Sequence, residues 1–276
     1  MPELPEVETT RRHIAPVLEG ATITAVTLGR ERMARRNMRP QDIPERLLGR
    51  RVGRVGRRGK FLLIEVEGDL MWVIHLGMSG RMRITSPEEP LDPHTHLVVT
   101  TDRGQQVRLI DPRTFGFVAV FTPEELESDS LSGLGPDALE ELPDPATLGT
   151  RLAGRRAPMK ALLLDQRLVA GLGNIYADEV LFRARVRPTR PGGEVTATEL
   201  EELIAAIPEV LVAGVEMGGT SLDDLAYLLP DGRAGEYLDR LMVYGRTGEP
   251  CYVCGTPIER VVVAQRSSHF CPNCQR

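Results

Sequence analysis

Four cysteines, all within the last 26 residues, form two Cys-x2-Cys pairs. Cys251 and Cys254 make the first pair, and Cys271 and Cys274 follow after a gap of 16 residues. Each pair can place two thiolates on one turn, and two such turns close a tetrahedron around Zn²⁺. Two disulfides are the alternative, which a reducing cytoplasm disfavours. Because four protein ligands leave no open coordination position, we expect one structural zinc ion.

A glycine-rich turn, residues 171–174, stands between two helical patterns. The helix expected from Ile175 would aim its free N–H groups and its positive dipole end at an anion. Asn174 could cap this helix or donate its amide to a phosphate. Taken alone, the motif slightly favours an ordinary helix connection. Phosphate binding requires Lys160 and Arg266, at the tip of the cysteine-bearing segment, to converge on the turn.

Two further turns carry bulky side chains. Residues 75–80 read HLGMSG and residues 111–116 read DPRTFG. An exposed Met78, Arg113 and Phe115 would suit insertion into a base stack, where apolar wedges offset lost stacking. Each apolar side chain taken alone is better explained as a core residue.

The chain starts with a proline and two carboxylates, Pro2, Glu3 and Glu6. Residues 5–19 have the pattern of a helix, with a proline in the first turn, acidic residues at the positive dipole end and Gly20 after the last turn. Pro16 could end this helix early. Because most chain ends lack ordered structure, such a start indicates a functional N-terminus.

Charge is unevenly distributed along the 276 residues, whose net charge is −5. Residues 30–60 hold 12 Lys and Arg against 3 Asp and Glu, whereas residues 122–147 hold 8 acidic and no basic residues. DNA responds to the local field rather than to the total charge. The basic run is therefore compatible with phosphate binding, and an unevenly charged surface explains it equally well.

The element pattern changes once along the chain. Eight short segments have β patterning, at residues 21–28, 51–57, 61–67, 70–76, 81–85, 97–101, 107–110 and 117–121. Strands at this spacing predict a sandwich or barrel. An acidic stretch rich in Pro, Ser and Gly follows at 122–149 and marks a boundary. Helices are expected at 159–168, 175–184 and 197–213, and a loop at 222–237.

No apolar run is long enough to span a membrane, and residues 1–20 lack a secretory signal pattern. We therefore expect a cytoplasmic protein.

Together these motifs resemble the formamidopyrimidine-DNA glycosylases of bacteria, over essentially the whole chain. The resemblance is carried by MPELPEVETT at 1–10, RRGKFLL at 57–63, HLGMSG at 75–80, DPRTFG at 111–116, LLLDQRLVAGLGNIYADEVLF at 162–182, VYGRTGEPCYVCGTPI at 243–258 and AQRSSHFCPNCQ at 264–275. The first motif and GLGNIYADE are the most specific.

The resemblance implies an α+β fold. It consists of an N-terminal β-sandwich domain flanked by helices (1–122), an acidic linker (123–150), a helix–two-turn–helix domain with a lesion-recognition loop (151–240) and a zinc ribbon (241–276). It also implies a monomer that binds double-stranded DNA containing oxidised bases, close to the bacterial nucleoid and away from membranes.

The implied activity is a bifunctional DNA glycosylase and AP lyase that excises 8-oxoguanine and formamidopyrimidines. Once Met1 is removed, Pro2 would carry a free secondary amine that attacks C1′. An α-amine with a reference pKa near 8 is partly neutral at pH 7, and an adjacent helix start lowers that pKa further. A secondary amine gives an iminium without an N–H proton to lose, which remains an electron sink for β,δ-elimination.

Further roles follow from the resemblance. Glu3 would exchange protons with the sugar and substrate, Glu6 would support the site, and Lys60 would contact a phosphate beside the lesion. Glu6 could instead be only a helix-start anion worth ~0.5 kcal/mol. The implied DNA contacts are His75, Met78, His94, Arg113, Phe115, Lys160, Asn174 and Arg266.

The lesion loop departs from the commoner family pattern, with Ala234 where proline is frequent and Tyr237 where phenylalanine is frequent. This leaves the ranking of lesions open. Two alternatives stay in view: an oxidised-pyrimidine glycosylase on the same fold, and a non-catalytic zinc-ribbon protein that binds DNA.

Overall fold

The computed structural model describes residues 2–222 and 227–276. Two compact units make up the chain: the residues up to Gly133 together with Val215–Leu238, and Leu134–Gly214 together with Asp239–Arg276. Residues 215–238, which the sequence grouped with the helical domain, thus belong to the first unit. Met1 and part of the expected lesion loop lie outside the described residues. The four-part domain division stays a prediction.

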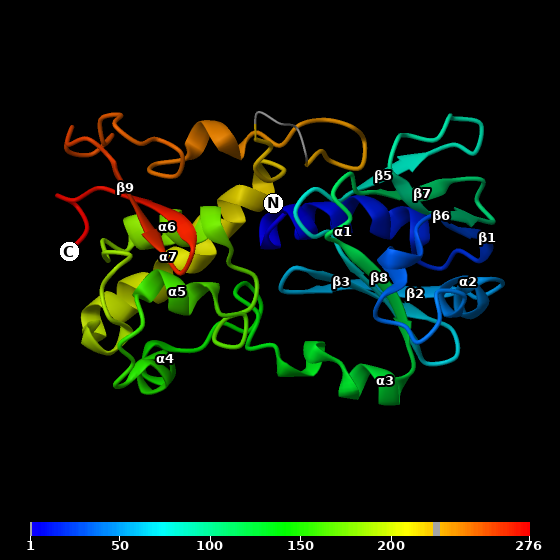
Figure 1. The fold of residues 1–276 in the computed structure, drawn as a ribbon, viewed down its shortest axis with the longest axis horizontal. Coiled ribbons are helices and arrows are strands. Elements are labelled where there is room, and N and C mark those ends of the chain that lie inside the picture. Colours follow the sequence, from blue (N-terminus) through cyan, green and yellow to red (C-terminus); the bar gives the residue numbers. More distant parts are fainter. Residues whose placement is uncertain (1, 223–226) are drawn as a thin grey trace. The chain divides into compact units, whose positions relative to one another are not determined.

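The first unit contains both large sheets (Figure 1). Its elements are α1 (Leu4–Leu18), β1 (Ile23–Leu28), η1 (Glu31–Ala34), α2 (Asp42–Leu47), β2 (Val52–Arg58), β3 (Phe61–Val66), β4 (Leu70–His75), β5 (Arg81–Thr85), β6 (Thr95–Thr101), β7 (Gln106–Ile110), β8 (Phe117–Phe121), α3 (Pro123–Ser128) and η2 (Ser130–Gly133).

Both sheets are four-stranded and antiparallel, in the orders β1-β6-β7-β5 and β2-β3-β4-β8. Alternate residues of β3, Leu62 and Ile64, are fully buried and share one core with Val99 and Leu109 of the other sheet. Burying each such side chain contributes about 1.5–3 kcal/mol. The predicted β-sandwich flanked by helices is confirmed, and the eight predicted strands are present with ends shifted by two residues or fewer.

Helix α1 packs against the strands of this unit, and its apolar side chains Val7, Ile14 and Leu18 enter the shared core. Pro16 does not end it early, because the helix continues to Leu18 and the Glu19 N–H still reaches the Ala15 carbonyl at 2.9 Å.

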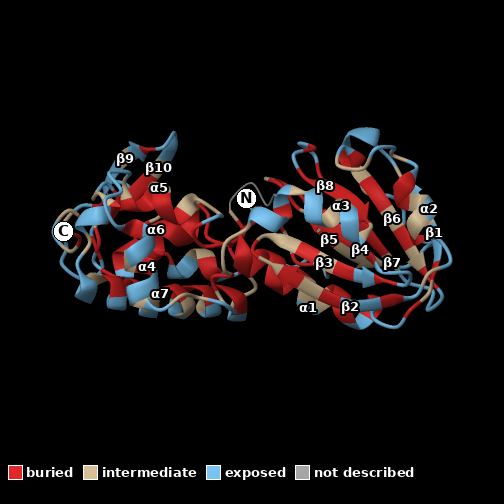
Figure 2. Cartoon of the chain, turned by 90° about the horizontal axis from the view of Figure 1, so that it is seen from below, coloured by how far each residue is buried: buried red, intermediate tan, exposed pale blue. Residues whose placement is uncertain are grey.

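The second unit is helical and ends in a two-stranded ribbon (Figure 1). Its elements are α4 (Pro145–Leu152), α5 (Met159–Leu164), α6 (Asn174–Arg183), η3 (Gly192–Glu194), α7 (Ala197–Glu216, whose last two residues belong to the first unit), η4 (Tyr237–Arg240, whose first two residues do too), β9 (Glu259–Val263) and β10 (Arg266–Phe270). Figure 2 colours the buried residues red, and α6 is buried from Ile175 to Phe182. None of the described helices combines the length and apolarity needed to cross a bilayer.

Two helical expectations need correction. Helix α5 ends at Leu164 rather than at Leu168, because the Asp165 carboxylate accepts the Arg167 N–H at 3.1 Å and turns the chain. The acidic stretch is not a plain linker, because it holds α3 and α4. Both of these helices begin with a capping residue followed by proline, Thr122-Pro123 and Asp144-Pro145.

Candidate functional site

The N-terminal turn of α1 is buried, and the carboxylates of Glu3 and Glu6 cap its free backbone N–H groups. Pro2 is buried, and Glu3 and Glu6 are 1% and 2% exposed. Glu3 is the N-cap residue, and its N–H donates to Glu6 Oε2 at 2.7 Å. This capping arrangement fixes the chain beside Pro2, at the positive end of the helix dipole.

The second oxygen of Glu6 ties α1 to a distant segment of the same unit. Oε1 accepts the Thr220 N–H at 2.7 Å. The Tyr227 hydroxyl donates to the Glu6 carbonyl at 3.2 Å, and burial raises the pKa of Tyr227, so this hydroxyl stays protonated. At Gly219 (φ +84) a Cβ would lie 2.7 Å from Glu6 Oε1, which leaves room for glycine alone. Glu6 therefore holds the segment at Thr220 against the start of α1, in addition to placing a negative charge at the helix start.

Lys60 lies at the tip of the β2–β3 hairpin and is half-buried. Gly59, with φ +56, provides the first turn position. The buried Arg57 holds that turn, because its guanidinium donates to the Gly59 carbonyl at 3.0 Å and to Glu8 Oε2 at 3.3 Å. Burial would raise the pKa of Glu8, but hydrogen bonds from Arg11 and Arg12 and the charges of Arg11 and Arg57 lower it overall.

His75 ends β4 between two aromatic rings. Its ring centroid lies 4.7 Å from that of Phe61 and 5.6 Å from that of Phe117. Nδ1 accepts the Gly77 N–H at 3.1 Å, so the neutral ring carries its proton on Nε2. His75 can therefore donate one hydrogen bond from Nε2 to an acceptor such as a phosphate oxygen.

The pKa of His75 is lowered to about 4. Burial is the largest cause, and the charges of Lys60, Arg36 and Arg35 lower the pKa further, while Asp111 opposes them. The imidazole is consequently neutral at pH 7. The neighbouring cations Lys60, Arg36 and Arg35 can offset the negative charge of a phosphate.

The two wedge-bearing turns are held together by a buried carboxylate, Asp111. Its Oδ1 accepts the Ser79 hydroxyl at 2.6 Å and its Oδ2 accepts the Gly116 N–H at 2.8 Å. Its own N–H donates to the carbonyl of His94 at 3.1 Å, and His94 is exposed with φ +65. At Gly77 a Cβ would lie 2.3 Å from the Gly116 nitrogen, so the turns touch backbone to backbone.

Arg35 binds the backbone of the turn at residues 111–116. Its guanidinium donates to the carbonyls of Gly116 at 2.5 Å and Phe115 at 2.9 Å. Phe115 is 45% exposed, and the Arg113 guanidinium lies 5.0 Å from its ring. Met78 is partly exposed. The three side chains predicted to enter the base stack, the apolar wedges Met78 and Phe115 and the base-pairing Arg113, therefore all reach the surface of the unit.

In the second unit, Gly173 is the N-cap of α6, and Asn174 is its first helical residue rather than its cap. The Asn174 amide nitrogen lies 3.4 Å from Ser267 Oγ, while Oδ1 is buried without a hydrogen-bond partner among the described residues. The amide nitrogen carries two N–H groups, so it can bind Ser267 and still offer one N–H. Asn174 is thus suited to donate to an anion at the helix start.

Arg266 is exposed at the first position of β10. The preceding turn residues, Ala264 and Gln265, both have positive φ, 48° and 61°, as in a type I′ hairpin. Lys160 differs from the sequence prediction. Its side chain is 0% exposed and donates to Asp178 at 2.7 Å and to the Ser267 carbonyl at 2.6 Å. We therefore correct its predicted role from a direct DNA contact to an internal one.

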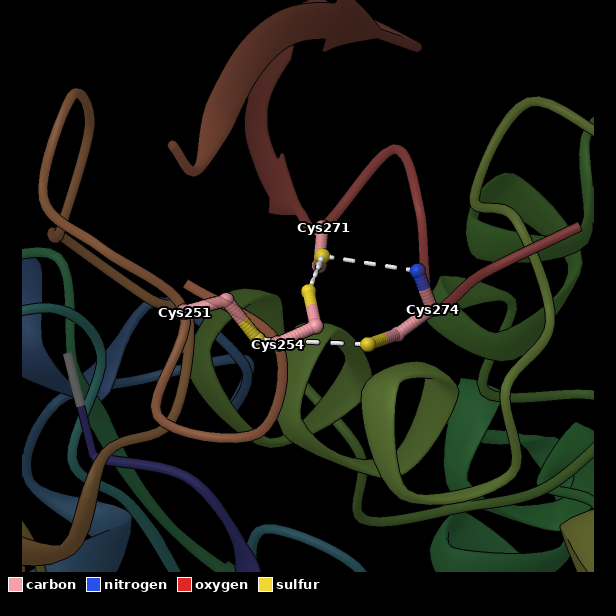
Figure 3. A group of neighbouring side chains, drawn as sticks. All are labelled: Cys251, Cys254, Cys271 and Cys274. Carbon is pink, nitrogen blue, oxygen red and sulfur yellow. Dashed lines mark hydrogen bonds between the residues drawn. The ribbon is translucent and has the colours of Figure 1, made fainter. Parts of the chain in front are cut away.

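The four cysteines form one cluster, with all Sγ atoms within 4.8 Å of one another. Figure 3 shows their side chains pointing toward a common centre. Burial, followed by the neighbouring sulfurs, raises the pKa of Cys274, whereas hydrogen bonds from Thr256 lower that of Cys254 to about 5. Four thiolates so close together need a cation to offset their repulsion, and tetrahedral Zn²⁺ matches this donor set.

Two adjacent buried acids in α6 escaped the sequence prediction, although paired carboxylates in an apolar helix are a signal. Glu179 accepts the backbone N–H groups of Met242, Val243 and Tyr244 at 2.8–3.0 Å. Burial raises the pKa of Glu179 against these hydrogen bonds. Glu179 thus fixes residues 242–244, in the segment that leads to the cysteine cluster.

Comparison with known proteins gives three matching family models. They are the formamidopyrimidine-DNA glycosylase N-terminal domain over residues 1–118, the H2TH domain of the same enzymes over 134–225, and a zinc finger found in FPG and IleRS over 248–276. The formamidopyrimidine-DNA glycosylase of Rhizorhabdus wittichii is 46% identical, with both chains fully covered.

Two solved structures are similar over almost the full length. The crystal structure of MutM (Fpg) from Thermus thermophilus gives a TM-score of 0.88 at 44% identity, covering 99% of this chain and 98% of that one. A Lactococcus lactis Fpg mutant in complex with DNA containing Fapy-dG gives 0.91 at 32% identity, with both chains fully covered.

The first prediction concerns His75 and pH. Between pH 6.5 and about 4, the unfolded chain binds a proton at this residue that the folded chain does not. We therefore expect the free energy of unfolding to fall as the pH is lowered through this window, by up to about 1.4 kcal/mol per pH unit from this group. Denaturant unfolding of the protein and of His75→Phe, from pH 4 to 7.5, measures the difference. Parallel profiles would contradict the assignment.

The second prediction concerns metal removal. We expect one zinc ion per chain by elemental analysis and four thiols that react with a colorimetric reagent only after a strong chelator is added. Since structural zinc contributes about 10–16 kcal/mol of binding free energy, its removal should unfold the ribbon. Cys271→Ser should lower the zinc content and DNA affinity together, whereas Ser128→Ala, on the exposed face of α3, should change neither.

Proposed function

The chain belongs to the formamidopyrimidine-DNA glycosylase family, so it is a DNA glycosylase and AP lyase of base-excision repair, and we propose that it excises 8-oxoguanine and formamidopyrimidines with Pro2 as its nucleophile. The observation that carries this proposal is the buried, capped N-terminal turn that holds Pro2 beside Glu3 and Glu6. The fixed position of Pro2 allows its nitrogen to act as a nucleophile once this nitrogen is a free amine.

The proposed reaction begins when the Pro2 amine attacks C1′ and the bond to the damaged base breaks. Glu3 exchanges protons with the sugar and the departing base. The amine then loses its proton, and protonation of O4′ opens the sugar by breaking the C1′–O4′ bond, which gives an iminium that has no N–H. The nitrogen therefore stays cationic while protons are removed from the sugar carbons and both phosphates are eliminated. Glu6 takes no proton in this scheme; it holds the helix start against Thr220 and so positions Pro2.

The remaining residues take three kinds of contact with DNA in this proposal. Attack at C1′ requires the nucleotide to leave the stack, and we assign Met78, Arg113 and Phe115 to the space it leaves. Lys60, His75, Asn174 and Arg266 are assigned to phosphates, since each offers N–H donors. His94 is assigned to the DNA surface beside the wedge turns.

The cysteine cluster holds one structural zinc ion, in accord with the matching zinc-finger model. Zinc supplies no step of the reaction; it fixes the ribbon that carries Arg266. Since the relatives compared are bacterial, we propose that the enzyme acts on DNA in the bacterial cytoplasm, at the nucleoid. The monomeric state implied by the family resemblance is kept as part of the proposal.

Reductive trapping tests the nucleophile. The protein is incubated with a duplex containing 8-oxoguanine opposite cytosine in the presence of borohydride, and the adduct is mapped by peptide mass. We expect the adduct at Pro2, on chains that have lost Met1. An adduct at a lysine would overturn the assignment. Trapping with thymine glycol but not with 8-oxoguanine would instead assign the enzyme to oxidised pyrimidines.

Glu3→Gln tests the acid–base role. A positioned proton-transfer group contributes about 10²–10⁴-fold to rate, so excision under single-turnover conditions should slow by that factor. Affinity for DNA with a tetrahydrofuran abasic analogue should stay within about twofold, because the amide keeps the side chain's size. Glu127→Gln, on the exposed side of α3, is the matched control and should change neither quantity. Equal losses of rate and affinity would contradict a catalytic role.

A further inference from the structure

Asp178 is a fully buried carboxylate with four donors around it. Its Oδ1 accepts the Lys160 ammonium at 2.7 Å and the Ser268 hydroxyl at 2.8 Å. Its Oδ2 accepts the His269 N–H at 2.8 Å and lies 3.3 Å from His269 Nδ1. The acceptor capacity of the carboxylate is thus filled from within the second unit. At 0% exposure it cannot touch DNA itself.

The network continues through Lys160 to both phosphate-binding residues of this unit. The ammonium group also donates to the Ser267 carbonyl at 2.6 Å and lies 3.5 Å from the Asn174 carbonyl. Ser267 Oγ in turn lies 3.4 Å from the Asn174 amide nitrogen. Ser267 directly follows Arg266 in β10. The network therefore joins the start of α6 to the start of β10.

Helix α6 and strand β10 are in contact along this network. One carboxylate of α6 binds two successive residues of β10, Ser268 and His269, and its counter-ion binds a third, Ser267. A shift of the strand by one residue would break all these bonds at once. The network thus fixes the register of the ribbon against the helix, and with it the spacing between Asn174 and Arg266.

The energetics of buried ion pairs also favour a positioning role for Asp178 and Lys160. A buried ion pair is commonly no more stabilising than a well-packed apolar pair, whereas loss of one partner costs about 3–5 kcal/mol. Apolar side chains at both positions could hold α5 and α6 together equally well. They could not fix the hydrogen-bond register of β10.

We propose that Asp178, through Lys160 and Ser267, is the positioning residue that sets the distance between the two phosphate-binding groups Asn174 and Arg266. The inference rests on the proposed function, since it takes these two residues as phosphate contacts. It adds that their joint engagement depends on a residue that meets no DNA.

The test measures how DNA affinity depends on salt. The slope of log K against log salt becomes shallower by about 0.9 for each phosphate of duplex DNA that the protein no longer neutralises, and a decrease in stability alone does not change it. The probe is a duplex with a tetrahydrofuran abasic analogue, titrated by fluorescence anisotropy from 50 to 300 mM KCl. The variants are Asp178→Asn and the apolar pair K160M/D178L, which leaves no unpaired buried charge.

For both variants we expect a slope shallower by about 1–2 and an affinity about 10–100-fold weaker at 150 mM salt, with one zinc ion per chain retained. Asn174→Ala should weaken the wild type but add little in the Asp178→Asn background. Arg183→Ala removes an exposed ion pair on the same helix and is the control that should leave the slope unchanged.

An unchanged slope in either folded, zinc-loaded variant would overturn the proposal, as would a full additive effect of Asn174→Ala. If Asp178→Asn alone does not fold, the apolar pair decides. Failure of the proposed function is recognised separately, because the wild-type protein would then not prefer the abasic duplex over undamaged DNA.

Discussion

Buried carboxylates that accept backbone N–H groups hold the functional segments of both units to their frameworks. Glu6 binds Thr220, Asp111 binds Gly116, Asp178 binds His269 and Glu179 binds the segment before the cysteine cluster. A carboxylate removed from water must find such partners, because leaving a charge unpaired costs several kcal/mol. Loops held this way have one position instead of many. That rigidity is what an enzyme needs when it must distort DNA rather than itself.

Many of the cations in the basic run at residues 30–60 bind partners within the first unit. Seven arginines of the run bind carboxylates or carbonyls of the same unit: Arg35, Arg36, Arg39, Arg46, Arg50, Arg54 and Arg57. Two of the partners, Asp129 and Glu125, belong to the acidic stretch after β8, so the two charged segments partly neutralise each other. The positive charge that this run can offer to DNA is therefore smaller than its count of 12 Lys and Arg suggests.

Sequence patterns predicted the strands and the zinc ligands because each depends on local spacing or on a specific motif. They did not reveal that Lys160 is enclosed, since burial of a lysine depends on a carboxylate 18 residues away and on a strand more than 100 residues away. They also missed α3, although its Thr-Pro-Glu-Glu start is a capping box readable in the sequence. There the low hydrophobicity of the stretch outweighed the capping signal.

The segment after α7 has two points where the backbone leaves no room. Besides Gly219, which faces Glu6, a Cβ at Gly235 would lie 2.4 Å from the Gly219 carbonyl oxygen. The Tyr237 N–H donates to that same carbonyl at 3.1 Å. A substitution at either glycine would force the backbone to move, whereas position 234, whose side chain is exposed, has room for other residues. An exchange of that side chain leaves the close contacts of both glycines, Gly219 with Glu6 and Gly235 with the Gly219 carbonyl, in place.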